Sequence, residues 1–141
     1  MPAIPSLKQY LAAYVAAFLV MGALDFLWIG VLMTDFYKVR LGALMLEQPR
    51  MGAAALFYLL YIFGVTWFGV RPGLKAGQLG VAAGSSALFG VIAYATYDLT
   101  NLATLKTWFV DLTVIDMVWG ATISAASGSA GYLAARALGR R

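Results

Sequence analysis

Three aspartates lie within long apolar stretches of this sequence, at Asp25, Asp98 and Asp116. An aspartate near the centre of a membrane helix costs about 2.5–3.5 kcal/mol to insert, so such residues indicate function by default. Brought together, carboxyl groups can hold a proton, a cation or a small polar molecule, or can act as acid and base. The chemistry of this chain therefore depends on the elements that position these three acids.

Composition places those elements in a membrane. Of 141 residues, 62% are hydrophobic and 11% are charged, whereas soluble domains carry about 25% charged residues. The chain has no His and no Cys, which excludes disulfides, structural zinc sites and nucleophiles that depend on Cys or His. We predict one domain, 1–141. The net charge of +4 fits basic ends at anionic lipid and indicates no nucleic-acid partner.

The charged residues divide the chain into four apolar intervals, each long enough for the roughly 20 residues that cross a bilayer. They predict an all-α bundle of four transmembrane helices over 8–33, 52–70, 78–103 and 109–135. The first is too long for a signal-peptide core and is expected to be permanent. Residues 34–50 form either a loop or a short interfacial helix. Residues 71–77 read as a turn-rich basic connection. Residues 104–108 make the last two helices antiparallel neighbours.

Four crossings place both termini on one side of the membrane. That side carries six cations, which are Lys8, Arg71, Lys75, Arg136, Arg140 and Arg141. The other side carries four, which are Lys38, Arg40, Arg50 and Lys106. Because cytoplasmic loops carry the excess of Lys and Arg, we expect both termini in the cytoplasm.

The three acids fall in the same half of the predicted bundle. At 1.5 Å per residue, Asp25, Asp116 and Asp98 lie about 13, 12 and 8 Å from the far ends of their helices. Each has possible donors nearby: Trp28 and Trp119 follow Asp25 and Asp116 by three residues, and Asp98 has Asn101 three residues after it and Tyr94 four before it. The candidate ligand or ion site is Asp25, Trp28, Tyr58, Tyr61, Tyr94, Asp98, Asn101, Asp116 and Trp119. It forms either a hydrogen-bonded structural cluster or a polar cavity with a function.

Small residues recur at intervals of four in the last two predicted helices. Such spacing lets helix backbones approach closely in lipid. They predict packing between these helices or with a second copy of the chain, a homo-oligomer, through Gly80, Gly84, Gly120, Ser124 and Gly128.

Several stretches resemble a bacterial family of predicted membrane proteins known as domain of unknown function 2177. They are residues 24–30 (LDFLWIG), 54–61 (AALFYLLY), 94–105 (YATYDLTNLATL), 116–120 (DMVWG) and Asp111. The resemblance implies four transmembrane helices in the bacterial inner membrane, and it implies no activity. Catalytic residues and cofactors stay unassigned, and no metal site is predicted.

Three functions fit these features. The first is binding or transport of a small molecule, proton or cation through the aspartate-lined cavity. The second is a membrane-embedded enzyme with Asp and Tyr chemistry on a lipid-like substrate. The third is a non-catalytic subunit or ligand-binding scaffold of a membrane complex. We place the first ahead of the others.

Overall fold

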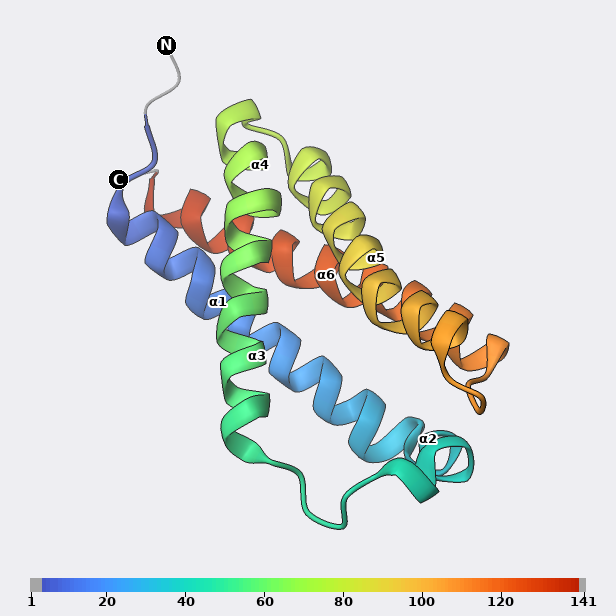
Figure 1. Ribbon diagram of the computed structural model, residues 1–141. Helices are drawn as coiled ribbons and strands as arrows, with labels where there is room; N and C mark the ends of the chain where they lie inside the picture. Colours follow the sequence, from blue (N-terminus) through green and yellow to red (C-terminus); the bar gives the residue numbers. More distant parts are fainter. Residues whose placement is uncertain (1–3, 140–141) are drawn as a thin grey trace.

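The computed structural model describes residues 4–139, and this part of the chain is helical, without strands. The helices form a bundle in which α1, α5 and α6 run alongside one another and α3 crosses at an angle (Figure 1). In chain order they are α1 (Leu7–Leu27) with a π-helical turn (Trp28–Leu32), α2 (Thr34–Leu41) with a 3₁₀ turn (Gly42–Leu44), α3 (Met51–Gly64) with a π-helical stretch (Val65–Val70), α4 (Arg71–Ala76), α5 (Leu79–Thr104) and α6 (Val110–Leu138).

Local chemistry defines where the helices begin and turn. A capping box begins α1: the Ser6 hydroxyl accepts from the Gln9 amide at 3.3 Å, and the Gln9 side chain accepts from the Ser6 amide at 2.9 Å. Between α4 and α5 the chain reverses at Gly77, where φ is +67°, a conformation that glycine adopts without a steric penalty. These signals account for the start of α1 and the end of α4.

Three helices are long and apolar enough to cross a membrane within the described residues. They are Leu7–Leu32, Met51–Ala76 and Leu79–Thr104, each 26 residues long. The fourth predicted span forms a single 29-residue helix, α6, but its composition is less apolar. Much of its surface faces protein rather than lipid, so Gly and Ser serve there in place of Leu or Ile. Length and composition therefore support three membrane-crossing helices, not clearly four.

The predicted loop at 71–77 is wrong for most of its length, and the second predicted span, 52–70, is too short. The helix that begins at Met51 continues to Ala76, with Pro72 in the first turn of α4. Proline cannot donate a helical hydrogen bond, and it ends most helices. Here the π-helical stretch Val65–Val70 lies immediately before it, a local adjustment that lets a membrane helix accommodate proline.

Residues 34–50 combine the two forms left open by the sequence. The segment begins with α2 and a 3₁₀ turn, and an extended connection then leads to α3. Met33 is the residue that precedes the first turn of α2. The Thr34 hydroxyl donates to the Ile29 carbonyl at 2.6 Å, which links the start of α2 to the π-helical turn that follows α1.

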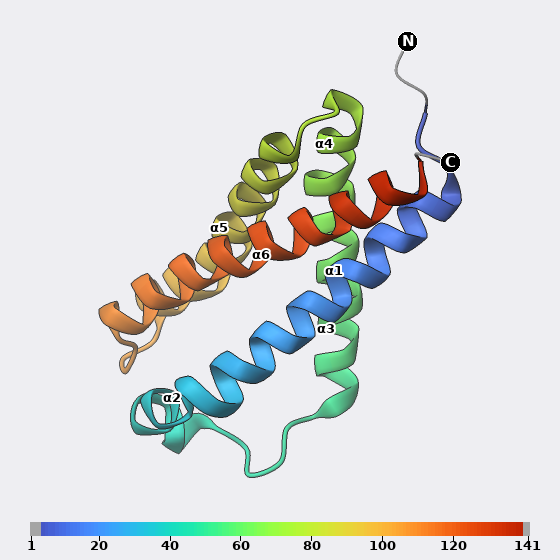
Figure 2. The same cartoon turned by 180° about the vertical axis from the view of Figure 1, so that it is seen from behind.

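The last helix, α6, is the centre of the bundle. It passes between α1 and α5, and its most extensive contacts are with these two helices (Figure 2). The antiparallel packing of α5 and α6 confirms the expectation from their short connection. Glycines make this approach possible: Gly90 lies against the Gly120 carbonyl, and Gly128 lies against Ser86. The small residues of α6 are thus used within the chain.

The other predicted small pair has a different environment. Gly80 and Gly84 are exposed on α5, and a β-carbon added at either would meet no atom within 4 Å. A homo-oligomer through these residues stays a prediction.

Candidate functional site

Asp25 of α1 accepts hydrogen bonds on both carboxylate oxygens. The Tyr58 hydroxyl of α3 donates at 2.6 Å, and the Trp119 indole N–H of α6 donates at 3.1 Å. The side chain is 5% exposed. Two donors from two other helices therefore stabilise this buried group, and they join α1 to α3 and α6.

Asp116 of α6 is bonded by a residue that sequence reasoning missed. The Tyr37 hydroxyl of α2 donates to Asp116, and it accepts the Trp28 indole N–H at 3.0 Å. Burial raises the pKa of the Tyr37 phenol, and its bond to Asp116 raises it further, so the hydroxyl stays protonated as a donor. Tyr37 lies outside every predicted span, and no helical spacing relates it to Asp116.

The two tryptophans connect these groups. The rings of Trp28 and Trp119 stack with centroids 4.2 Å apart and planes inclined by 5°. The sequence suggested that each indole could serve the aspartate three residues before it. Each instead donates to another element, Trp119 to Asp25 of α1 and Trp28 to Tyr37 of α2. The stacked pair thereby links the surroundings of Asp25 to those of Asp116.

Asp98 of α5 has fewer stabilising partners than the other two acids. Its side chain is 0% exposed, and neither carboxylate oxygen meets an N–H or O–H donor among the described residues. Asp116 lies across the contact between α5 and α6: Tyr94, four residues before Asp98, packs against Gly120, four residues after Asp116, so antiparallel packing sets the two acids opposite each other. Two carboxylates that face each other away from water repel each other strongly. This pair is the most unusual feature of the bundle.

The remaining predicted residues divide into two groups. Tyr61 and Tyr94 lie beside the acids, and the Tyr61 hydroxyl is 2.7 Å from the Ser124 hydroxyl. Asn101 is half-buried, and within the described residues its side chain forms no hydrogen bond. Its backbone carbonyl accepts from Leu105. The structure thus brings eight of the nine predicted residues to one region, and Asn101 is the exception.

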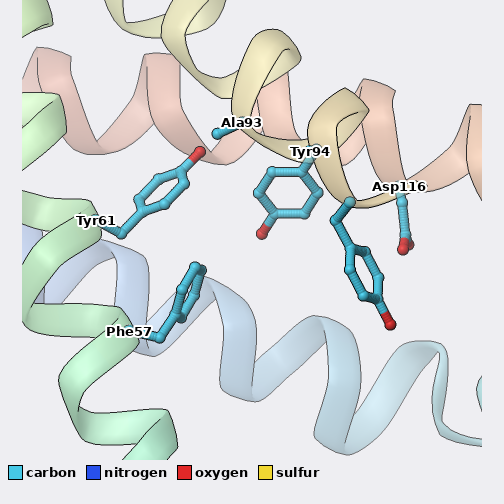
Figure 3. Close-up of a pocket in the computed structure, with 6 residues that line it drawn as sticks. Phe57, Tyr61, Ala93, Tyr94 and Asp116 are labelled. Atoms are coloured by element: carbon cyan, nitrogen blue, oxygen red, sulfur yellow. The ribbon is translucent and has the colours of Figure 1, made fainter. Parts of the chain in front are cut away.

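Two cavities adjoin this region. The larger has a volume of about 490 Å³ and is lined by Phe57, Tyr61, Ala93, Tyr94, Tyr97 and Asp116 (Figure 3). The smaller has a volume of about 220 Å³ and is lined by Asp25, Trp28, Ile29, Tyr37, Leu41, Met45, Tyr94, Asp116 and Trp119. Tyr94 and Asp116 belong to both linings.

Within the described part of the chain, no Lys or Arg lines either cavity. Among residues 4–139 one ion pair forms, between Arg40 of α2 and Asp111 in the first turn of α6. Arg40 also lies over the Phe36 ring, 3.7 Å from its centroid. The described residues contain no group of three or more His, Cys, Asp or Glu side chains arranged to hold a metal ion. Asp25 and Asp116 are therefore stabilised by hydroxyl and indole donors rather than by positive charge, and Asp98 has neither among the described residues.

Comparison with known proteins gives one match. A family model described as "Predicted membrane protein (DUF2177)" matches residues 10–133. That range includes all three buried aspartates and Tyr37. No curated protein and no solved structure matches the chain. Because the model covers most of the sequence, the chain belongs to this family of predicted membrane proteins, as the resemblance of its motifs indicated.

Proposed function

We propose that the chain crosses the bacterial inner membrane four times, with both termini in the cytoplasm and α6 as the fourth span. The Gln9 side chain donates to the Ala135 carbonyl at 3.1 Å, so the start of α1 lies beside the end of α6. Neighbouring ends on one side of a membrane require an even number of crossings. The excess of cations at that end favours the cytoplasm. In this arrangement α2 lies at the opposite interface.

Single cysteines on either side of α6 test the fourth crossing, because the chain has no Cys of its own. Lys106 and Leu138 are exposed at opposite ends of α6. We expect an impermeant thiol reagent to label Lys106→Cys in intact cells, and Leu138→Cys only after permeabilisation. If both positions react from the same side, α6 does not cross.

We further propose that the chain binds a positive charge, as a proton, a cation or a small cationic molecule, and moves it in a transport cycle. The observation that carries this proposal is the Asp98–Asp116 pair, buried at the α5–α6 contact with no ion-pair partner among residues 4–139. Leaving charge uncompensated in a low-dielectric interior is costly, and a proton or cation removes that cost. Acids that bind and release such a ligand can couple its movement to a change in the bundle, since occupancy of the acid pair changes the charge of the bundle.

Asparagine at position 98 tests this function. Asp98→Asn keeps the shape of the side chain but removes its charge and its proton. In proteoliposomes with an imposed pH gradient, we expect the proton flux of the wild type to fall at least about tenfold, because intramembrane acids carry such relays.

The control is Asp35→Asn, which removes an exposed carboxyl in the first turn of α2, away from the cavities. This variant should retain the wild-type flux. Both proteins must elute as single species of equal thermal stability, so that a loss of flux is not a loss of folding. Equal flux through Asp98→Asn and the wild type would exclude the transport proposal.

A further inference from the structure

The larger cavity opens sideways, between α3 and α5. Phe57 of α3 and Tyr97 of α5 lie at its edge, 47% and 55% exposed, whereas Asp116 at its inner end is 8% exposed. Both helices are membrane-crossing by length and composition. In the helix Met51–Ala76, the part from Val65 onward packs against α5. The first part, α3 (Met51–Gly64), has its main contact with α1 among the other helices. A ligand therefore has an entry from the lipid.

The walls of this cavity are aromatic. Figure 3 shows Phe57, Tyr61 and Tyr94 around one space, with Asp116 beside them. Aromatic faces attract cations, most strongly where water is excluded, and ring cages of this kind bind quaternary ammonium groups. The volume of about 490 Å³ lies within the range typical of small-molecule sites.

Charge and hydrogen bonding restrict the chemical class of the ligand further. An acid and no Lys or Arg line the cavity, which disfavours an anionic head group. A primary ammonium brings three N–H donors that need acceptors. The acceptors in the lining are the Asp116 carboxylate and tyrosine hydroxyls, of which that of Tyr61 is already paired with Ser124, and the rest of the wall is ring and methyl surface. A methylated ammonium has no such requirement, because its surface is apolar and its charge is diffuse.

We propose that this cavity binds an amphiphile with a methylated ammonium head, which rests among the rings beside Asp116 while its alkyl chain leaves between α3 and α5 into the bilayer. The inference rests on the proposed function, since it names the class of cation that the acid site takes. The same charge that repels Asp98 from Asp116 attracts this head group.

Binding of decyltrimethylammonium to the chain in nanodiscs tests the proposal, with empty nanodiscs as the measure of partition into lipid. The matched probe is its carbon isostere, in which a neutral carbon replaces nitrogen. We expect the isostere to bind at least about tenfold more weakly, because it keeps the shape and loses the charge. Equal binding of the two probes would overturn the inference.

Two variants locate the site. Phe57→Leu combined with Tyr97→Leu removes rings at the mouth, and we expect affinity for the ammonium to fall about tenfold. Phe63→Leu is the control, because Phe63 is also an exposed ring of α3 but does not line the cavity. It should bind as the wild type does. Equal affinities in the double variant and the control would show that the ligand binds elsewhere.

The two proposals fail in different ways. If Asp98→Asn abolishes proton flux while the ammonium and its isostere bind equally, the transport proposal stands and the ligand class is wrong. If the ammonium binds as expected while Asp98→Asn conducts as the wild type does, the cavity is a binding site and the transport proposal is wrong.

Discussion

Replacement of Gly128 by leucine is expected to prevent the chain from forming a stable bundle. A β-carbon at Gly128 would lie 1.9 Å from the Ser86 hydroxyl oxygen and 2.6 Å from its β-carbon. Ser86 is packed equally tightly against Gly69, where a β-carbon would meet the same oxygen at 1.9 Å. One serine is therefore held between two glycines. Overpacking of this kind costs about 3 kcal/mol or more when neither neighbour can yield.

The measurement is unfolding of the purified protein in mixed micelles, with Gly22→Leu as the matched control. Gly22 is an exposed glycine of α1, and a β-carbon there would meet no atom within 4 Å. We expect the control to stay within about 0.5 kcal/mol of the wild type. Should Gly128→Leu unfold at the same denaturant concentration as Gly22→Leu, α6 does not pack against α5 as described.

Removal of one hydroxyl at Tyr37 is expected to have the second largest effect. Tyr37→Phe leaves Asp116 without its O–H donor and leaves the Trp28 N–H without its acceptor. Groups left unpaired in a buried site cost about 1–3 kcal/mol each. The same bond is one of two links from α2 to α6, beside the Arg40–Asp111 ion pair, so its loss should also loosen α2.

Hydrogen exchange measures the loosening of α2, and thermal unfolding measures the loss of stability. We expect faster exchange across α2 (Thr34–Leu41) in Tyr37→Phe, and a lower thermal stability of the whole chain. Tyr97→Phe is the control, because the Tyr97 hydroxyl forms no hydrogen bond within the described residues and is largely exposed. Protection of α2 that is equal in the two variants would mean that the Tyr37 bond does not hold this helix.

Much of the framework follows from composition and spacing. Apolar intervals separated by charges predict four long helices, since a helix that crosses lipid must be about 20 residues long and nearly uncharged. The spacing of charges misplaces the end of the second predicted span. Pro72 and the basic residues Arg71 and Lys75 read as a connection, but the helix passes through them to Ala76. A π-helical adjustment has no signature in the composition, so sequence patterns cannot predict it.

At the site, too, the sequence predicts part of the arrangement and the structure decides the rest. Counting residues along each helix places Asp25, Asp98 and Asp116 at similar depth, because the helical rise is constant. Depth does not specify rotation. The structure decides which side chains face one another, and it pairs Trp119 with Asp25 and Trp28 with Tyr37. Spacing along one helix favours partners on that helix, whereas the closest donors came from neighbouring ones.

By itself, then, the sequence determined that the chain is an all-helical membrane protein and that three acids share one level within it. These properties depend on local hydrophobicity and on a regular rise per residue, which each segment carries alone. Only the tertiary structure decided that Tyr37 bonds Asp116, that Asp98 is left without a donor, and that the cavity beside them opens between α3 and α5. Those features arise from how helices rotate and pack, which glycine contacts between distant segments control.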